Sequence, residues 1–118
     1  VPTLNLSPVE EQHPSVGVYV TRTRLGSGTH ESVTNIGYKP TFGDLDLSIE
    51  TYLLNFQGEI DRREVEIEYL HRLRDEIKFQ NPEILKMQIR EDVRRSRKFF
   101  RLLTEIEDRL GRPPGLSS

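Results

Sequence analysis

One acidic residue lies in a run whose pattern is typical of a strand. Glu50 belongs to the segment 48–56, and it is followed at every second position by Tyr52, Leu54 and Phe56. Alternation along a strand therefore places its carboxylate on an apolar and aromatic face. A carboxylate loses hydration there, which favours either a hydrogen-bond partner or a pKa raised toward the range of a general base. Two interpretations stay open, a structurally satisfied strand glutamate and a catalytic base.

The elements that would position Glu50 follow from the hydrophobic pattern. Strands are predicted at 17–23, 31–36, 48–56 and 65–69. Glycine turns at 26–28 and 57–59 separate them, and the first turn makes the first two strands a hairpin. Val65, Ile67 and Tyr69 alternate, so they should share the core face. Short strands with no helix between them predict an antiparallel barrel or sandwich.

From Asn81 onward the period becomes helical. Asn81 suits an N-cap and Pro82 the first helical position. Apolar residues then recur at helical spacing, at Leu85, Ile89, Val93, Phe100 and Leu103. Gly111 and the prolines after it end the helix. We therefore predict one domain over 1–118, with a β-barrel at 1–79, a C-terminal helix at 81–110 packed on its side, and a tail at 111–118.

Composition restricts the classes of protein. The 118 residues are 34% hydrophobic and 31% charged, which suits one water-soluble domain with a modest core. There is no cysteine, which excludes disulfides and thiolate metal sites and is compatible with the cytoplasm. No apolar run has the length of a membrane span, and the first residues do not resemble an export signal. The formal net charge of −2 predicts no nucleic-acid partner.

Common phosphate and metal motifs are missing from the sequence. It contains no Walker loop with its lysine, and the glycines at 26–28 lack the strand-to-helix context of a dinucleotide site. His13, His30 and His71 are scattered, which argues against a transition-metal site. Chemistry on this chain would use hydroxyl, amide and carboxylate groups.

Four segments, in this order, resemble the riboflavin kinase (flavokinase) family. Pro-Thr-Leu-Asn at 2–5 is similar to the family's Pro-Thr-Ala-Asn, and Asn-Ile-Gly-Tyr-Lys-Pro-Thr-Phe at 35–42 to its Asn-Ile-Gly-x-Arg-Pro-Thr-Phe. Residues 50–56 resemble Glu-x-His-Leu-Leu-Asp-Phe, and 73–79 resemble Leu-Arg-x-Glu-x-Lys-Phe. Residues 88–92 resemble the helix signature of the family. The third and fourth segments are closest in style to the C-terminal domain of the bacterial bifunctional riboflavin kinase/FAD synthetase.

The resemblance implies a fold and an activity. The fold would be a six-stranded Greek-key antiparallel barrel with a long C-terminal helix packed on it. The activity would be transfer of the ATP γ-phosphate to the 5′-hydroxyl of riboflavin, with riboflavin/FMN and ATP/ADP as partners and no membrane. An N-terminal domain that converts FMN to FAD would precede this kinase domain.

The resemblance also implies roles for four residues. Thr3 would ligate Mg²⁺ together with phosphate oxygens, Asn5 would hold the phosphates and the flavin side chain, and Glu50 would be the base. Mg²⁺ prefers hard oxygen donors, and one carboxylate near the attacking hydroxyl orients it and takes its proton. Arg74 would bind the flavin or anchor a loop, with a surface ion pair to Glu76 as the alternative.

Three departures separate the chain from the family pattern. Ile-Asp-Arg at 60–62 stands where the family has Leu-Tyr-Gly. Lys39 stands where arginine is common, which keeps the charge but loses bidentate geometry. The family also has a segment containing glycine and arginine before the position of Val1, so we expect that segment to matter for nucleotide binding.

Other interpretations stay open beside the kinase. Phe79 is predicted to pack between barrel and helix. The basic helical residues are predicted to form a solvated face, and they are Arg90, Arg94, Arg95, Arg97, Lys98 and Arg101. A small barrel with such a helix could be a non-catalytic nucleic-acid-binding module. The altered loop at 60–62 would also be compatible with a module that binds flavin without turnover.

Overall fold

The computed structural model describes residues 2–7, 12–26, 28–41, 44–60, 64–78 and 81–111. The predictions made for Phe79, for positions 61 and 62 of the altered loop, and for the tail after Gly111 lie outside this part of the chain.

Five antiparallel strands form one sheet, and a single long helix follows them. The strands are β1 (Thr3–Leu6), β2 (Gly17–Leu25), β3 (Gly28–Thr41), β4 (Asp44–Leu53) and β5 (Glu66–Arg74), and the helix is α1 (Pro82–Leu110). Their order across the sheet is β1-β4-β3-β2-β5. The prediction of an antiparallel β fold with a C-terminal helix is confirmed. Within the described residues β1 and β5 are edge strands, so a sixth strand and closure into a barrel are not seen there.

The inner face of the sheet carries two apolar clusters with a polar ladder between them. One cluster is centred on Leu4, Leu25 and Leu53, and the other on Tyr19, Ile36 and Ile49. Between them, fully buried hydroxyls bond to one another across β2, β3 and β4 in the order Thr23, Ser32, Thr21, Thr34 and Thr51, at 2.7–2.9 Å. Each hydroxyl finds its partner on a neighbouring strand, so these polar groups are buried without remaining unsatisfied.

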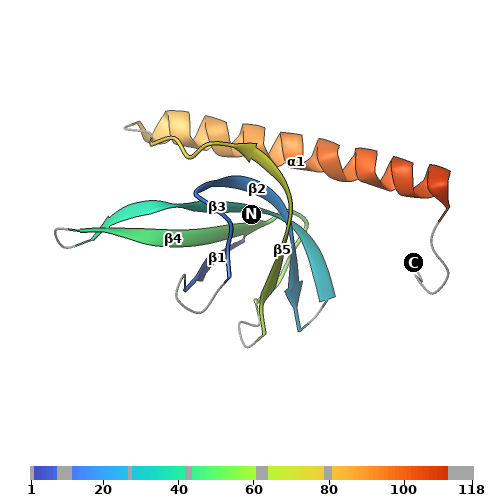
Figure 1. Cartoon of the computed structure of the whole chain (residues 1–118), viewed down its shortest axis with the longest axis horizontal. Coiled ribbons are helices and arrows are strands. Elements are labelled where there is room, and N and C mark those ends of the chain that lie inside the picture. Colours follow the sequence, from blue (N-terminus) through green and yellow to red (C-terminus); the bar gives the residue numbers. More distant parts are fainter. Residues whose placement is uncertain are drawn as a thin grey trace.

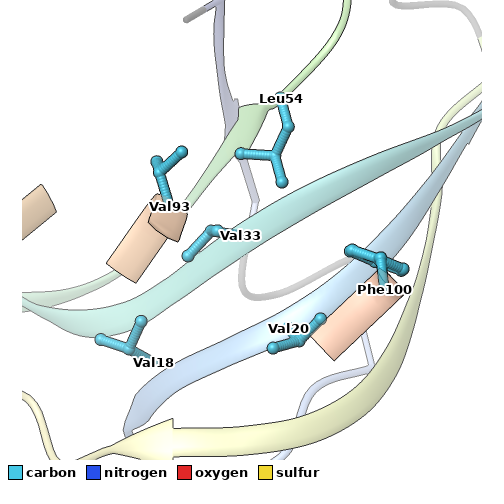
Figure 2. Packing of buried hydrophobic residues seen from close by; sticks show 6 residues of the cluster. All are labelled: Val18, Val20, Val33, Leu54, Val93 and Phe100. Carbon is cyan, nitrogen blue, oxygen red and sulfur yellow. The ribbon is translucent and has the colours of Figure 1, made fainter. Parts of the chain in front are cut away.

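The opposite face is covered by α1, which lies across it (Figure 1). Val93 and Phe100 from the helix pack against Val18, Val20 and Val33 of the sheet (Figure 2). β2 is therefore buried on both faces, which explains its nearly continuous burial from Gly17 to Thr21. Of the predicted helical stripe, Val93 and Phe100 are buried, whereas Leu85 is 42% exposed.

The helix begins and ends as predicted. The Asn81 side chain accepts a hydrogen bond from the backbone N–H of Glu83 at 2.8 Å, and Pro82 is the first residue of α1. Gly111 follows the last helical residue with φ = +73°, a conformation that favours glycine. The strand around Glu50 differs from its predicted bounds, because β4 runs over Asp44–Leu53. Phe56 consequently packs with the inner cluster around Leu4 and does not share the face of Tyr52.

Among the described residues, no helix has the length and apolarity needed to cross a membrane.

Candidate functional site

Strand register places three polar residues in one row across the sheet. Glu50 on β4 is paired with Asn5 on β1 on one side and with Asn35 on β3 on the other. Residues directly opposite each other on antiparallel strands project from the same face. Asn35 is also paired with Val18, whose side chain packs under α1, so this is the face that the helix partly covers.

The neighbouring row on the same face adds a hydroxyl and a phenol. Thr3 is paired with Tyr52, and Tyr52 is paired with Val33 on its other side. Thr3 and Asn5 are therefore successive residues on one face of β1, beside Tyr52 and Glu50 of β4. The structure brings together three of the four predicted site residues, Thr3, Asn5 and Glu50.

Both oxygens of the Glu50 carboxylate have partners. Lys39 Nζ forms an ion pair with Oε1, and the Tyr52 hydroxyl donates to Oε2 at 3.1 Å. The Glu50 side chain is only 15% exposed, whereas that of Lys39 is 56% exposed. The expectation that a partly buried carboxylate finds partners is confirmed, and the role of base stays a prediction. Burial and the nearby charge of Asp92 raise the pKa of Tyr52 above its usual 10, so its hydroxyl stays protonated and donates at neutral pH.

Arg74 lies on the same face and in the same row as Glu50, but on the distant edge strand β5. It is paired with Val18 across β5 and β2, and its guanidinium donates to both carboxylate oxygens of Asp92 on α1, at 2.8 and 2.7 Å. Their side chains are 15% and 5% exposed. This bidentate pair fixes the helix to the sheet. The ion pair of Arg74 is thus with Asp92 and not with Glu76, which corrects the alternative considered above.

Glu76 has a different position. Its carboxylate accepts a hydrogen bond from the backbone N–H of Tyr38 at 3.2 Å and lies over Gly37. A Cβ at Gly37 would collide with this carboxylate, so the glycine of the Asn-Ile-Gly segment allows the close approach.

Two adjacent cavities flank these side chains. The smaller, about 30 Å³, is lined by Asn35, Tyr52, Arg74 and Asp92 within an apolar wall. The larger is a cleft of about 970 Å³ beside α1, and it shares Ile89 and Val93 with the smaller cavity. Its volume lies in the range of small-molecule sites.

Four arginines of α1 line the large cleft. The cleft itself is not predictable from the sequence pattern. The arginines are Arg90, Arg94, Arg97 and Arg101, above a floor that includes Val93 and Phe100. Their side chains are exposed, as expected for a solvated face. Arg94 pairs with Glu91 at 2.6 Å, and Arg97 donates to the Leu54 carbonyl at 3.2 Å. The spacing of 4, 3 and 4 residues could have identified one helical face, but only the tertiary structure gives that face an opposite wall.

The oxygen donors of this site fit a magnesium ion that is held mainly by substrate phosphates and water, with few protein ligands. Within the part of the chain that the structure describes, no three His, Cys, Asp or Glu side chains gather into a metal site. The hydroxyl of Thr3 and the amide of Asn5 are hard oxygen donors on one face, beside the Glu50 carboxylate. Mg²⁺ is often bound through one or two protein oxygens, with phosphates and water completing the octahedron.

Comparison with known proteins finds relatives that share one description, riboflavin kinase. A family model described as riboflavin kinase (flavokinase) matches residues 1–100. The bifunctional riboflavin kinase/FMN adenylyltransferase of Haemophilus influenzae is 38% identical over 100 residues, covering 84% of this chain and 32% of that protein. The protein of the same name from Listeria monocytogenes is 39% identical over 109 residues, covering 91% and 34%. An RNA-binding riboflavin kinase, RibR of Bacillus subtilis, is 34% identical over 88 residues, covering 74% and 38%.

A solved structure has a similar fold. The crystal structure of a protein described as a macrolide-efflux protein from Streptococcus pneumoniae matches with a TM-score of 0.69 and 27% identity, covering 81% of this chain and 32% of that chain. The chain thus spans about a third of the length of the relatives it matches. Since the family model covers most of the sequence, including the segments that carry Thr3, Asn5 and Glu50, the chain belongs to the riboflavin kinase (flavokinase) family.

Proposed function

We propose that the chain transfers the γ-phosphate of ATP to the 5′-hydroxyl of riboflavin, giving FMN and ADP. The observation that carries this proposal is the row in which Glu50 lies directly between Asn5 and Asn35, with Thr3 one position away along β1. A single carboxylate beside amide and hydroxyl groups suits phosphoryl transfer, in which the protein mainly positions the substrates and stabilises charge.

Glu50 is the general base of the proposed reaction. The riboflavin 5′-oxygen attacks the γ-phosphorus while its proton passes to Glu50, and the bond from that phosphorus to the ADP oxygen breaks. The contact of Glu50 with Tyr52 supports this role, because the phenol fixes the orientation of the carboxylate. Asn5 donates to a phosphate oxygen and accepts from a substrate hydroxyl through the two ends of its amide.

Thr3 is the proposed protein ligand of Mg²⁺. The ion, bound with ATP, neutralises charge on the phosphates. Thr3 holds its hydroxyl on the same face as Asn5, so that the nucleotide phosphates lie along the β1 edge of the sheet.

The flavin occupies the large cleft beside α1 in this proposal. An apolar floor that includes Val93 and Phe100 suits a planar ring system, and the arginines supply hydrogen-bond donors at its edge. The cleft is adjacent to the smaller cavity lined by Tyr52, whose hydroxyl contacts Glu50, so a flavin side chain that reaches this cavity approaches the base. Arg74, whose guanidinium binds Asp92, contributes to flavin binding in the same proposal by holding the helix wall of that cavity in place.

Two finer expectations accompany the assignment. The described strands form part of a six-stranded Greek-key barrel. The whole protein is bifunctional like the relatives named for both activities, with a further domain that adenylylates FMN. Support for the second expectation is that the chain aligns with only a third of those relatives.

Nucleic-acid binding is a second candidate, favoured by the arginine-lined cleft and by the name of the Bacillus subtilis relative. The described strand tyrosines speak against it. Tyr19 and Tyr69 pack on the inner face and Tyr52 contacts Glu50, which leaves Tyr38 as the one exposed tyrosine on the described strands, whereas base stacking uses several exposed aromatics. We therefore expect no saturable binding of a fluorescent single-stranded RNA at physiological salt. Tight, salt-sensitive binding would favour the second candidate.

The test of the main proposal is conversion of riboflavin to FMN, followed by chromatography. Product should appear with ATP and Mg²⁺ together and not when EDTA removes the metal. Calorimetry with riboflavin and with ADP and Mg²⁺ separates the remaining outcomes. Binding of both without product would identify a flavin-binding module without turnover, and binding of neither would end the assignment.

A further inference from the structure

Asn35 has a buried oxygen without a partner. Its Oδ1 is shielded from solvent and has no hydrogen-bond partner within the described residues. The residue lies on β3 between Val18 on one neighbouring strand and Glu50 on the other, so its side chain is on the face of the proposed site. Buried polar atoms are nearly always satisfied, and an orphaned acceptor in a site therefore needs a donor from outside the chain.

The other polar groups around the small cavity are already engaged. Tyr52 donates to Glu50, and Arg74 and Asp92 bind each other. The remaining lining residues are apolar side chains, namely Val18, Val33, Ile77, Leu85, Ile89 and Val93. Among the described residues that line this cavity, Asn35 is thus the polar group left to contact a ligand.

The cavity has room for one small polar group. Its volume of about 30 Å³ accommodates a hydroxyl or a single water. Ile89 and Val93 line both this cavity and the large cleft, so the two spaces are adjacent and a ligand in the cleft lies beside the cavity that Asn35 lines. An amide oxygen accepts from a hydroxyl but offers no donor at that atom, so the complementary ligand group is an O–H or N–H.

We propose that Asn35 is a substrate-binding residue whose Oδ1 accepts a hydrogen bond from a hydroxyl of the polyol side chain of the alcohol substrate. This inference rests on the proposed function, because it takes riboflavin as that substrate. Asn35 then distinguishes a flavin that carries a hydroxylated chain from one that does not. Together with Asn5, it flanks Glu50 with one amide on each neighbouring strand.

The test compares two flavins by fluorescence titration without ATP. Riboflavin carries the ribityl chain, whereas lumiflavin has the same ring system with a methyl group in its place. Asn35→Ala should weaken riboflavin binding about tenfold, the usual effect of one lost hydrogen bond, and leave lumiflavin binding as in the parent. Asn81→Ala is the matched control, because it removes the N-cap contact of α1 and should lower the melting temperature without changing the ratio of the two affinities.

Several outcomes would overturn the inference. Equal weakening of both flavins means that Asn35 supports the fold, and unchanged riboflavin binding means that a water satisfies its oxygen. Should Asn35→Ala fail to fold, Asn35→Val is measured instead, because valine suits a strand and has no acceptor, and a parent-like preference for riboflavin then contradicts the role. Parent protein that binds both flavins but makes no FMN contradicts the proposed catalysis alone, whereas parent protein that binds neither flavin contradicts both.

Discussion

At the scale of single residues, two side chains hold the carboxylate of Glu50. Lys39 forms an ion pair with it, and the hydroxyl of Tyr52 donates a hydrogen bond to it. The more exposed Lys39 is screened by solvent, so its ion pair contributes little to stability. The phenol is the less exposed partner, and its hydroxyl donates to the carboxylate at 3.1 Å.

Tyr52→Phe should lower kcat by roughly two- to tenfold, because Glu50 loses one hydrogen bond that orients it. The KM for ATP should stay near the parent value, since the phenol contacts Glu50 and is not a proposed ligand of the phosphates. Steady-state kinetics of FMN formation measures both parameters. Tyr38→Phe removes the hydroxyl of a tyrosine that is 45% exposed and serves as the control. Equal effects of the two substitutions would dismiss a specific role for Tyr52.

Thr3→Ala should weaken nucleotide binding only when Mg²⁺ is present, because the lost hydroxyl acts through the ion. Calorimetry with ADP, in Mg²⁺ and then in EDTA, measures the difference. Thr29→Ala alters an exposed threonine of the β2–β3 hairpin and should bind ADP as the parent does in both conditions. An equal loss with and without metal would remove Thr3 from the metal site.

At the scale of elements, one buried ion pair determines how α1 sits on the sheet. Arg74 and Asp92 are both nearly buried, and Gln88 adds a hydrogen bond to Asp92 at 3.1 Å. Such a pair contributes modestly as a whole, but removing one partner leaves a buried charge uncompensated. The helix wall of both cavities depends on this contact, because residues between Ile89 and Val93 line them.

Asp92→Ala should therefore lower the free energy of unfolding by about 3–5 kcal/mol. Urea denaturation measures the loss, and flavin binding should weaken with it. Glu91→Ala is the matched control one residue away, because it breaks only the exposed pair with Arg94. Its unfolding curve should stay close to that of the parent. A similar loss in both variants would mean that α1 is held by helix propensity and not by the Arg74 contact.

The elements were predictable to different degrees, for physical reasons. Asn81, Pro82 and Gly111 specify the ends of α1 through local hydrogen bonds and backbone conformation, so the sequence predicts them. Which strands are neighbours depends on contacts distant in sequence. The row that joins Asn5 to Glu50, and the pairing of Arg74 with Asp92, therefore became visible only in the folded chain. The sequence predicts only a solvated face for the arginines of the cleft, because their opposite wall comes from β3 and the turn after β4.

At the scale of the whole molecule, one face of the sheet holds the core and the other holds the proposed site. Its inner face is closed by two apolar clusters and a ladder of buried hydroxyls that satisfy one another. Its outer face packs under α1 in one part (Figure 1). Another part of this face carries the polar row of Glu50. The rigid inner face fixes the register of β1, β3 and β4, and that register alone aligns Asn5, Glu50 and Asn35.

The most direct test of this account is the turnover of Glu50→Gln, measured as FMN formed from riboflavin and ATP with Mg²⁺ at neutral pH. Glutamine keeps the shape of the side chain and one accepting oxygen but cannot take the proton. We predict that kcat falls by roughly 10²–10⁴-fold, while riboflavin affinity and melting temperature stay close to those of the parent. A kcat near the parent value, with a lowered melting temperature, would show instead that Glu50 is a structural carboxylate held by Lys39 and Tyr52 and would contradict the account.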